Sequence, residues 1–245
     1  PRADRQTPMS ISRLTLALEG HGLELPEDGR IAVFAPRVGT DLGALGRDRV
    51  CVVQPNRVDF EAFERAGYAC GVVEEGRFAV AVVFLPRAKQ QARDLIARAV
   101  EVADLVIVDG QKTNGADSVL KECKKRAEVE GVMSKAHGKL FWFCGGDFAD
   151  WRAAPMQVEG FETRVGVFSA DGIDPASRLL ADALPAKLGR NVADLGAGWG
   201  YLAREILTRE TVETLYLVEA DHVALECARA NVTDPRAEFH WADAT

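Results

Sequence analysis

A glycine-rich turn, DLGAGWG at residues 194–200, joins a short apolar run to a segment with helical periodicity. A strand, a glycine turn and a helix in this order are typical of a cofactor turn on an open α/β sheet. The glycines follow the spacing G-x-G-x-G, whereas dinucleotide sites use G-x-G-x-x-G. The acid Asp194 would repel a pyrophosphate but could attract an ammonium group. The turn therefore predicts a cofactor without phosphates that carries an amino-acid moiety.

Two further acids stand where such a cofactor would need them. Glu219 ends the next apolar run, 19 residues after Gly200, where its carboxylate could accept both ribose hydroxyls. Asp243, with the backbone of Ala244, follows a third run and could face an adenine. Each feature alone could be a structural turn or a surface acid, but the three in order predict a site for S-adenosylmethionine. The predicted cofactor-binding residues are Asp194, Gly196, Ala197, Gly198, Gly200, Glu219, Ala220, Asp243 and Ala244.

The order of elements around this turn indicates a parallel α/β sheet. Asp174 and Pro175 resemble a helix N-cap and first helical residue, and Leu179, Leu180 and Leu184 share one face of the helix that follows. Strands near 191–195, 214–220 and 237–243 alternate with helices, so the third strand is expected to end at Asp243.

The first half shows the same alternation and looks complete. Strands are expected at 30–36, 50–56, 78–86, 104–110 and 139–145, with helices at 58–67, 87–103 and 118–131. We therefore predict an α/β protein with two tandem Rossmann-like domains, residues 1–150 and 160–245. The connector begins at Gly145 and Gly146, which are expected to be flexible.

Composition narrows the class of protein. The net charge is −7 and no apolar run is long enough to span a bilayer. The five cysteines form no C-x-x-C pair, which argues against a zinc site and a disulfide framework, so we expect no metal. A reducing cytoplasm is the simplest location.

At the level of whole motifs, the second half resembles the class I S-adenosylmethionine-dependent methyltransferases of the small-domain group. The resemblance is carried by GVFSADGIDPASRLL, VADLGAGWGYL and LVEADHVALECARAN, and is strongest to the RsmC-type ribosomal RNA guanine N2-methyltransferases. It implies methyl transfer from S-adenosylmethionine to the exocyclic amine of a guanine, with Phe168 and Ser169 at the mouth of the site. Ala176 stands where the family has a glycine.

These enzymes are similar in having a degenerate methyltransferase-like domain ahead of the catalytic one. The stretches FLPRAKQQARDLI and VDGQKTNGADSVL match that domain. Pro36 and Arg37 stand where the acid and tight turn would be, and QPN ends the second strand without an acid for ribose. The first domain is therefore expected to have lost its cofactor site and to place substrate or pack on its neighbour.

Basic residues of the first domain are candidates for contacts with ribosomal RNA or a ribosomal subunit. The alternative is a solvated helix face, because acids lie nearby. The aromatic residues Phe141, Trp142 and Phe143 are expected in the core. The predicted RNA-contact residues are Lys112, Lys121, Lys124, Lys125 and Arg126, within a wider set that adds Arg87, Lys89, Arg93, Lys135 and Lys139.

The family's amine-binding motif, Asn-Pro-Pro-aromatic, does not occur in this sequence. The chain as given is therefore expected to be inactive, with only the first half of its second domain and a continuation beyond Thr245; no catalytic residue is named. Two alternatives remain: methylation of a protein amide or small molecule, or a non-catalytic RNA-binding or assembly module.

Overall fold

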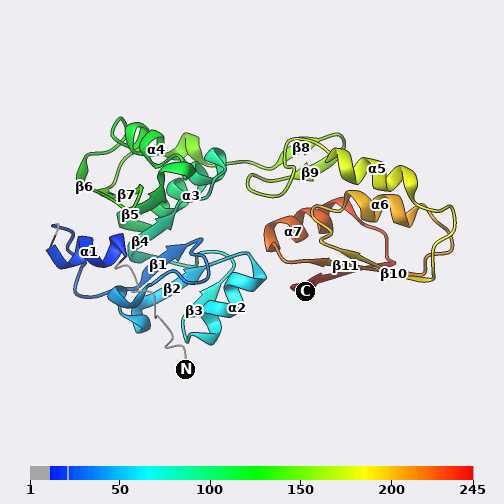
Figure 1. The fold of residues 1–245 in the computed structure, drawn as a ribbon, viewed down its shortest axis with the longest axis horizontal. Coiled ribbons are helices and arrows are strands. Elements are labelled where there is room, and N and C mark those ends of the chain that lie inside the picture. The colour runs from blue at the N-terminus through cyan, green and yellow to red at the C-terminus, as the bar shows by residue number, and fades with distance from the viewer. Residues whose placement is uncertain (1–11, 21, 245) are drawn as a thin grey trace, which may run out of the picture.

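The computed structural model describes residues 12–20 and 22–244. Figure 1 shows two lobes, one running from blue to green and one from yellow to red, joined by a single connecting segment. Each lobe is built on its own parallel-dominated sheet, and a small hairpin lies at the start of the second lobe. The α/β fold expected from the sequence is confirmed, while the division into two domains at 1–150 and 160–245 stays a prediction.

The larger sheet has the strand order β3-β2-β1-β4-β5-β7-β6. Its first five strands along the chain are parallel, and β7 is antiparallel to both of its neighbours. The central strands are continuous runs of valine, isoleucine and alanine because both faces of the sheet are covered. The strands are β1 (Ile31–Phe34), β2 (Val50–Val53), β3 (Ala69–Gly71), β4 (Phe78–Phe84), β5 (Ala103–Gln111), β6 (Val129–Lys135) and β7 (Gly138–Cys144).

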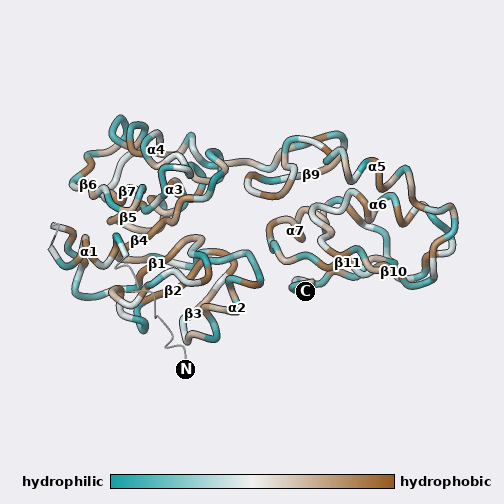
Figure 2. The backbone as a smooth tube through the Cα atoms, in the orientation of Figure 1, coloured by the Kyte–Doolittle hydropathy of each residue, from teal (hydrophilic) through white to brown (hydrophobic). Residues whose placement is uncertain are grey.

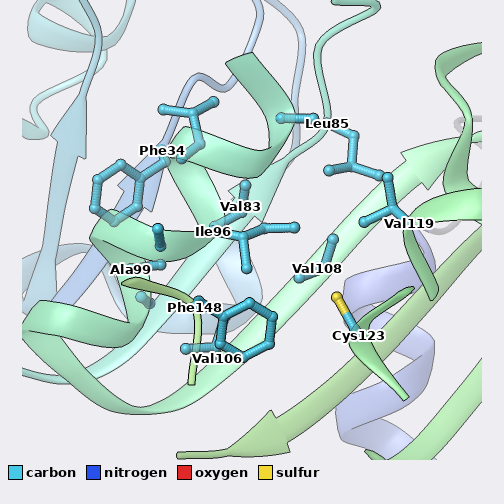
Figure 3. Close-up of a cluster of buried hydrophobic side chains, with 14 of the residues drawn as sticks. Phe34, Val83, Leu85, Ile96, Ala99, Val106, Val108, Val119, Cys123 and Phe148 are labelled. Atoms are coloured by element: carbon cyan, nitrogen blue, oxygen red, sulfur yellow. The ribbon is translucent and has the colours of Figure 1, made fainter. Parts of the chain in front are cut away.

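Helices cover both faces of this sheet. Figure 3 shows side chains from β1, β4 and β5 meeting those of α3 and α4 in one buried cluster, and Figure 2 shows hydrophobic residues along the same strands. Phe141, Trp142 and Phe143 are buried in the core, as expected. The helices are α1 (Arg13–Gly20), α2 (Arg57–Arg65), α3 (Lys89–Val102) and α4 (Ala116–Cys123), with 3₁₀ turns at Gly43–Leu45, Arg47–Arg49, Lys112–Asn114 and Ala149–Trp151.

The smaller sheet has the order β10-β11-β12 and is parallel throughout. Asp174 caps α5, since its carboxylate accepts the amide of Ser177 at 2.9 Å, and Pro175 is the first helical residue, as predicted. β12 ends at Trp241 rather than at Asp243, which lies two residues further on. The elements are α5 (Pro175–Ala183), β10 (Asn191–Leu195), α6 (Tyr201–Leu207), β11 (Thr214–Glu219), α7 (His222–Asn231) and β12 (Ala237–Trp241).

The connector is more ordered than the sequence indicated. Arg152 and the amide of Ala153 both bond to the buried carboxylate of Asp94 on α3, at 2.8 and 2.9 Å. Gly146 has a left-handed φ of 101°, and a Cβ there would lie 2.8 Å from the side chains of Ala127 and Phe148. Close approach, rather than flexibility, therefore explains this glycine. A hairpin of β8 (Met156–Val158) and β9 (Phe161–Thr163) follows.

The expected helix over 118–131 is wrong beyond Cys123. The chain turns at Lys124–Arg126 and continues as β6, which pairs with β7 at the edge of the sheet. The run KECKKRAEVEG fits helical periodicity, but pairing of Val132 and Met133 with the aromatic strand β7 outweighs local propensity. The short elements α1 and β3 had no clear signal in the sequence.

The apolar face expected on α5 does not face a core. Leu179 is 71% exposed and Leu180 is 51% exposed, and the buried residue of this helix is Ala181. α5 packs on α6, and this contact leaves the two leucines outward. Leu184, which directly follows α5, does pack against the core of the smaller sheet, so the three leucines do not share one environment.

Candidate cofactor-binding site

The turn after β10 adopts a conformation that requires glycine. Gly196, Gly198 and Gly200 have φ values of 76°, 55° and 91°, a region that side chains disfavour. The amides of Gly196 and Ala197 both donate to the carbonyl of Val218 on the neighbouring strand, at 2.8 and 3.1 Å. The turn is therefore pinned to β11 and fixed relative to the acid at its end.

The three glycines serve different purposes. A Cβ on Gly200 would lie 2.9 Å from Val232 and 3.4 Å from Ala228, so this glycine lets α6 pack against α7. Apart from the adjoining residues, no atom of the described part of the chain lies within 4 Å of a Cβ built on Gly196 or Gly198. The first two glycines thus border open space, as expected where a ligand approaches the backbone.

Asp194 is a buried acid with no cationic partner among the described residues. Its side chain is 7% exposed, and among the described residues its Oδ2 atom has no hydrogen-bond partner. Burial, together with the nearby Glu219 carboxylate, raises the pKa of Asp194 to about 6. A buried carboxylate oxygen that lacks a donor carries a free-energy cost, which a positively charged ligand group would relieve.

Glu219 ends β11 with its carboxylate already oriented. Oε2 accepts the amide of Gly198 at 2.8 Å, and Oε1 accepts the amide of Asp221 at 2.8 Å. Each carboxylate oxygen keeps a further lone pair, so the group can still accept two hydroxyls. The backbone of the glycine turn therefore holds in place the acid predicted to take the ribose.

The remaining predicted cofactor residues lie further round this edge. Ala220 follows Glu219 and its carbonyl accepts the indole Nε1 of Trp241 at 2.8 Å. Asp243 and Ala244 are exposed just after β12, whose neighbour in the sheet is β11. The structure thus brings the three predicted segments to the carboxyl edge of one sheet, where ligands bind in folds of this kind. Their role in binding stays a prediction.

Phe168 and Ser169, predicted at the mouth of the site, are tied to the glycine turn. The carbonyl of Phe168 accepts the indole Nε1 of Trp199 at 3.0 Å, while its ring is 71% exposed. Ser169 has a left-handed φ of 50°. An exposed aromatic ring held beside the turn is available to contact a flat ligand.

Two residues that support the turn were not singled out in the sequence. The side chain of Asn231 on α7 donates to the carbonyls of Trp199 and Glu162, both at 2.8 Å, and accepts the amide of Glu162 at 2.7 Å. Trp199 packs against Phe161 with ring centroids 5.0 Å apart. Nothing local distinguishes Asn231 from any other helix-end asparagine, so its role emerges only from the packing.

The larger sheet has a turn of the same geometry without the same chemistry. Val53 pairs with Phe34 as Val218 pairs with Leu195. The next residue, Ala35, donates its amide to the Val53 carbonyl at 3.0 Å, as Gly196 does to Val218. Ala35 has a φ of 53°, the left-handed conformation that glycine adopts in the other turn.

This equivalence identifies what has changed. Val33 takes the position of Asp194, Arg37 that of Gly198, and Gln54 that of Glu219. The sequence-based placement of Pro36 at the acid position is therefore wrong, since Pro36 matches Ala197. Gln54 is 3% exposed; its Oε1 accepts the amide of Asn56 at 2.9 Å, and its Nε2 donates to the carbonyl of Pro36 at 2.7 Å. With no acid for an ammonium or a ribose, these positions do not repeat the charges of the second turn.

A cleft of about 830 Å³ opens at this edge of the larger sheet. It is lined by Gln54 and Asn56 from the β2 end, by three arginines, and by Gly166 and Asp221 from the second lobe. Arg13 pairs with the buried Asp109 at 2.6 Å, and Arg37 pairs with Asp59 at 2.9 Å. The third, Arg87, is exposed and has no polar partner among the described residues. The cleft thus carries cations and amides rather than acids free to bind a cation.

The predicted RNA-contact residues do not form one cluster. Lys112 lies in a hollow of about 310 Å³ with Lys135, His137 and Lys139. Lys121 lies in the last turn of α4, and Lys124 and Lys125 are exposed directly after that turn, away from the hollow that Lys112 lines. Arg126 makes a bidentate pair with Asp150 at 2.6 and 2.8 Å, so its charge is compensated. Contact of these residues with RNA stays a prediction.

The described residues contain neither a candidate membrane span nor a candidate metal site. No helix within 12–20 and 22–244 has both the length and the apolar character to cross a membrane. The same residues contain no group of three or more side chains placed to hold a metal ion.

Comparisons with known proteins agree with this geometry. Residues 159–245 match the family model of the methyltransferase small domain. The ribosomal RNA small subunit methyltransferase C of Psychromonas ingrahamii is 27% identical over 67% of this chain and 51% of its own length. The ribosomal RNA large subunit methyltransferase G of Aeromonas salmonicida is 34% identical over 35% of this chain and 25% of its own length. The chain thus spans about half the length of the type C relatives it matches.

A solved structure gives the fold of nearly the whole chain. The 16S rRNA N2 methyltransferase RsmC of T. thermophilus, in complex with AdoMet and guanosine, superimposes with a TM-score of 0.71 at 21% identity. The match covers 90% of this chain and 67% of that one, so both sheets share its architecture. Residues 159–245 thus match the methyltransferase small-domain family, and the chain as a whole shares the fold of the RsmC structure.

Proposed function

We propose that this protein binds S-adenosylmethionine at the turn after β10 and transfers its methyl group to the exocyclic N2 amine of a guanine in small-subunit ribosomal RNA. The observation that carries the proposal is Asp194, a buried carboxylate with one unpartnered oxygen behind an open glycine turn. The type C relatives and the RsmC structure with AdoMet and guanosine support the same cofactor and the same class of substrate.

The site suits this cofactor by charge. Asp194 would attract the ammonium of the methionine moiety, and Glu219 would accept the ribose hydroxyls. Gly196 and Gly198 would let the ligand approach the backbone, and Ala220, Asp243 and Ala244 would border the adenine. When bound, the cofactor supplies a methyl group on a positively charged sulfur. The carboxylates of Asp194 and Glu219 would stabilise that charge.

The substrate amine would enter beside Phe168 and Ser169, where the exposed ring can stack on the guanine. Holding the amine in line with the methyl group would supply most of the rate. We assign no acceptor for hydrogen bonds from the amine within this chain, because the sequence contains no Asn-Pro-Pro-aromatic motif.

We assign the first lobe, residues 1–150, the role of a degenerate methyltransferase-like domain that binds RNA rather than cofactor. The replacement of Asp194, Gly198 and Glu219 by Val33, Arg37 and Gln54 supports this role. The second lobe, residues 160–245, carries the cofactor site. Action on ribosomal RNA also favours a cytoplasmic location.

Binding of S-adenosylmethionine to the protein, measured by calorimetric titration, tests this proposal. Asp194→Asn keeps the shape of the side chain but removes its charge, so we expect affinity to fall by at least about tenfold, as for a charged hydrogen bond. Asp182→Asn, an exposed acid on α5, is the matched control and should bind as the parent does. Equal affinity of Asp194→Asn and the parent would refute the site.

A further inference from the structure

The two lobes meet through equivalent turns, one after β2 and one after β11. Asn56 and Asp221 form an antiparallel β-bridge across this contact. Each is also an N-cap: Asn56 accepts the amide of Val58 at the start of α2, and Asp221 accepts the amide of Val223 at the start of α7. The contact therefore joins the first turns of two helices.

The two hydrogen bonds that make this bridge cross between the lobes in opposite directions. The amide of Arg57 donates to the carbonyl of Ala220 at 2.8 Å, and the amide of His222 donates to the carbonyl of Pro55 at 2.9 Å. Arg57 and His222 are the first residues of α2 and α7, whose amides have no partner within their own helices. Each helix start thus finds its partner on the other lobe.

Trp241, at the end of β12, donates its indole N–H to the same two carbonyls, those of Pro55 and Ala220. Its indole Nε1 lies 3.1 Å from the carbonyl oxygen of Pro55 and 2.8 Å from that of Ala220. The ring packs edge-on against Phe60 with centroids 5.0 Å apart, and the Arg57 guanidinium lies 4.7 Å from its centre. A residue of the second lobe is therefore anchored on α2 of the first.

These contacts converge on the turn that carries the ribose-binding acid. Glu219 directly precedes Ala220, and its Oε1 accepts the amide of Asp221. We propose that Arg57 and Trp241 are positioning residues, which hold the segment from Glu219 to Asp221 so that the Glu219 carboxylate meets the ribose. The first lobe would thus set cofactor affinity without touching cofactor. This inference rests on the proposed function of the Glu219 site.

One substitution isolates the crossing hydrogen bond. Arg57→Pro removes the amide that donates to Ala220, at a first helical position where proline is favoured. Asn56 before it is extended, with φ −82° and ψ 123°, as a residue preceding proline prefers. Arg57→Ala removes the same side chain but keeps the amide. The difference between the two variants therefore reports the replacement of the donating N–H by a proline ring that can only press on the Ala220 carbonyl.

An equivalent pair of variants can be made at His222 on the second lobe. His222→Pro removes the amide that donates to Pro55, and His222→Ala keeps it; Asp221 before it is also extended. Trp241→Phe retains an aromatic ring against Phe60 and removes the indole donor. These variants leave the test intact if any one of them fails to fold.

The probes are S-adenosylhomocysteine and its 2′,3′-dideoxy analogue, titrated into each folded variant. We expect Arg57→Pro to bind S-adenosylhomocysteine about tenfold more weakly than Arg57→Ala, as for one positioned charged hydrogen bond. The dideoxy analogue should show a smaller difference because it has no ribose hydroxyls for Glu219 to meet. Trp241→Phe should show the same selective loss.

Equal affinities within the Arg57 pair would overturn the inference while leaving the proposed cofactor site standing. An equal loss for both probes would also overturn it, because that result indicates general loosening rather than positioning of Glu219. Failure of the parent protein to bind S-adenosylhomocysteine at all would instead refute the proposed function, and this inference with it.

Discussion

At the scale of the residue, we expect the ionised carboxylate of Asp194 to lower the free energy of unfolding and to raise the affinity for a cationic ligand. Its pKa of about 6 lies above that of an unfolded aspartate, about 3.9. The folded protein thus holds this proton more tightly, and the free energy of unfolding falls as pH rises from about 4 to about 6. Asp194→Asn should remove that fall and raise the free energy of unfolding at neutral pH by about 1–3 kcal/mol.

Urea unfolding at acidic and neutral pH measures this effect. Cofactor affinity should show the opposite dependence: it should rise about tenfold per pH unit below the pKa of Asp194 and level off above it, because a cationic ligand favours the ionised acid. Asp194→Asn should flatten both profiles. A parent affinity that does not change with pH in this window would show that no ionised Asp194 takes part in binding.

The same position shows how far the sequence could lead. Asp194, Gly196 and Glu219 could be predicted because a strand, a turn and an acid at the next strand end are local patterns. The loss of a second site could be read from QPN, but not the arrangement of Gln54, whose amide bonds to Pro36 across two strands. That bond depends on register, which a sequence pattern does not contain.

At the scale of the element, Asp94 fastens the connector to α3. Its buried carboxylate accepts Arg152 at 2.8 Å and the amide of Ala153 at 2.9 Å. Asp94→Asn weakens both bonds and should lower the free energy of unfolding by about 1–3 kcal/mol. Asp104→Asn, an exposed acid paired with Arg77, is the control and should change it by less than about 1 kcal/mol. Equal unfolding curves for these two variants would show that the connector is held by Trp151 packing instead.

Elements that the sequence misassigned share one physical cause. The predicted helix at 118–131 runs into the first residues of β6, and the leucines at 179, 180 and 184 are predicted only to share one face. In both cases the outcome depends on the neighbouring element. Val132 and Met133 pair with β7, and on α5 Ala181 is buried whereas Leu179 is exposed. Periodicity indicates which residues share a face but does not identify what that face meets.

At the scale of the molecule, the carboxyl edges of β2 and β11 face one another. Asp221, two residues after Glu219, the acid that we propose binds the ribose, lines the cleft at the edge of the larger sheet. An RNA strand whose guanine enters beside Phe168 could therefore pass its phosphates along that cleft. In it, Arg87 is exposed and has no polar partner within the described residues. RNA phosphates would give the Arg87 guanidinium an anionic partner.

Arg87→Glu should therefore weaken binding of a fluorescein-labelled single-stranded RNA, measured by anisotropy, by about tenfold and reduce the salt slope by about one. Lys187→Glu makes the same change of charge on an exposed loop before β10, and should have little effect. The double reversal of Lys124 and Lys125 tests the rival face at the end of α4. If the double variant loses more RNA affinity than Arg87→Glu, the RNA binds at the end of α4 and not in the cleft. A loss from Arg87→Glu alone would instead place it between the two lobes, next to the turn that carries Glu219.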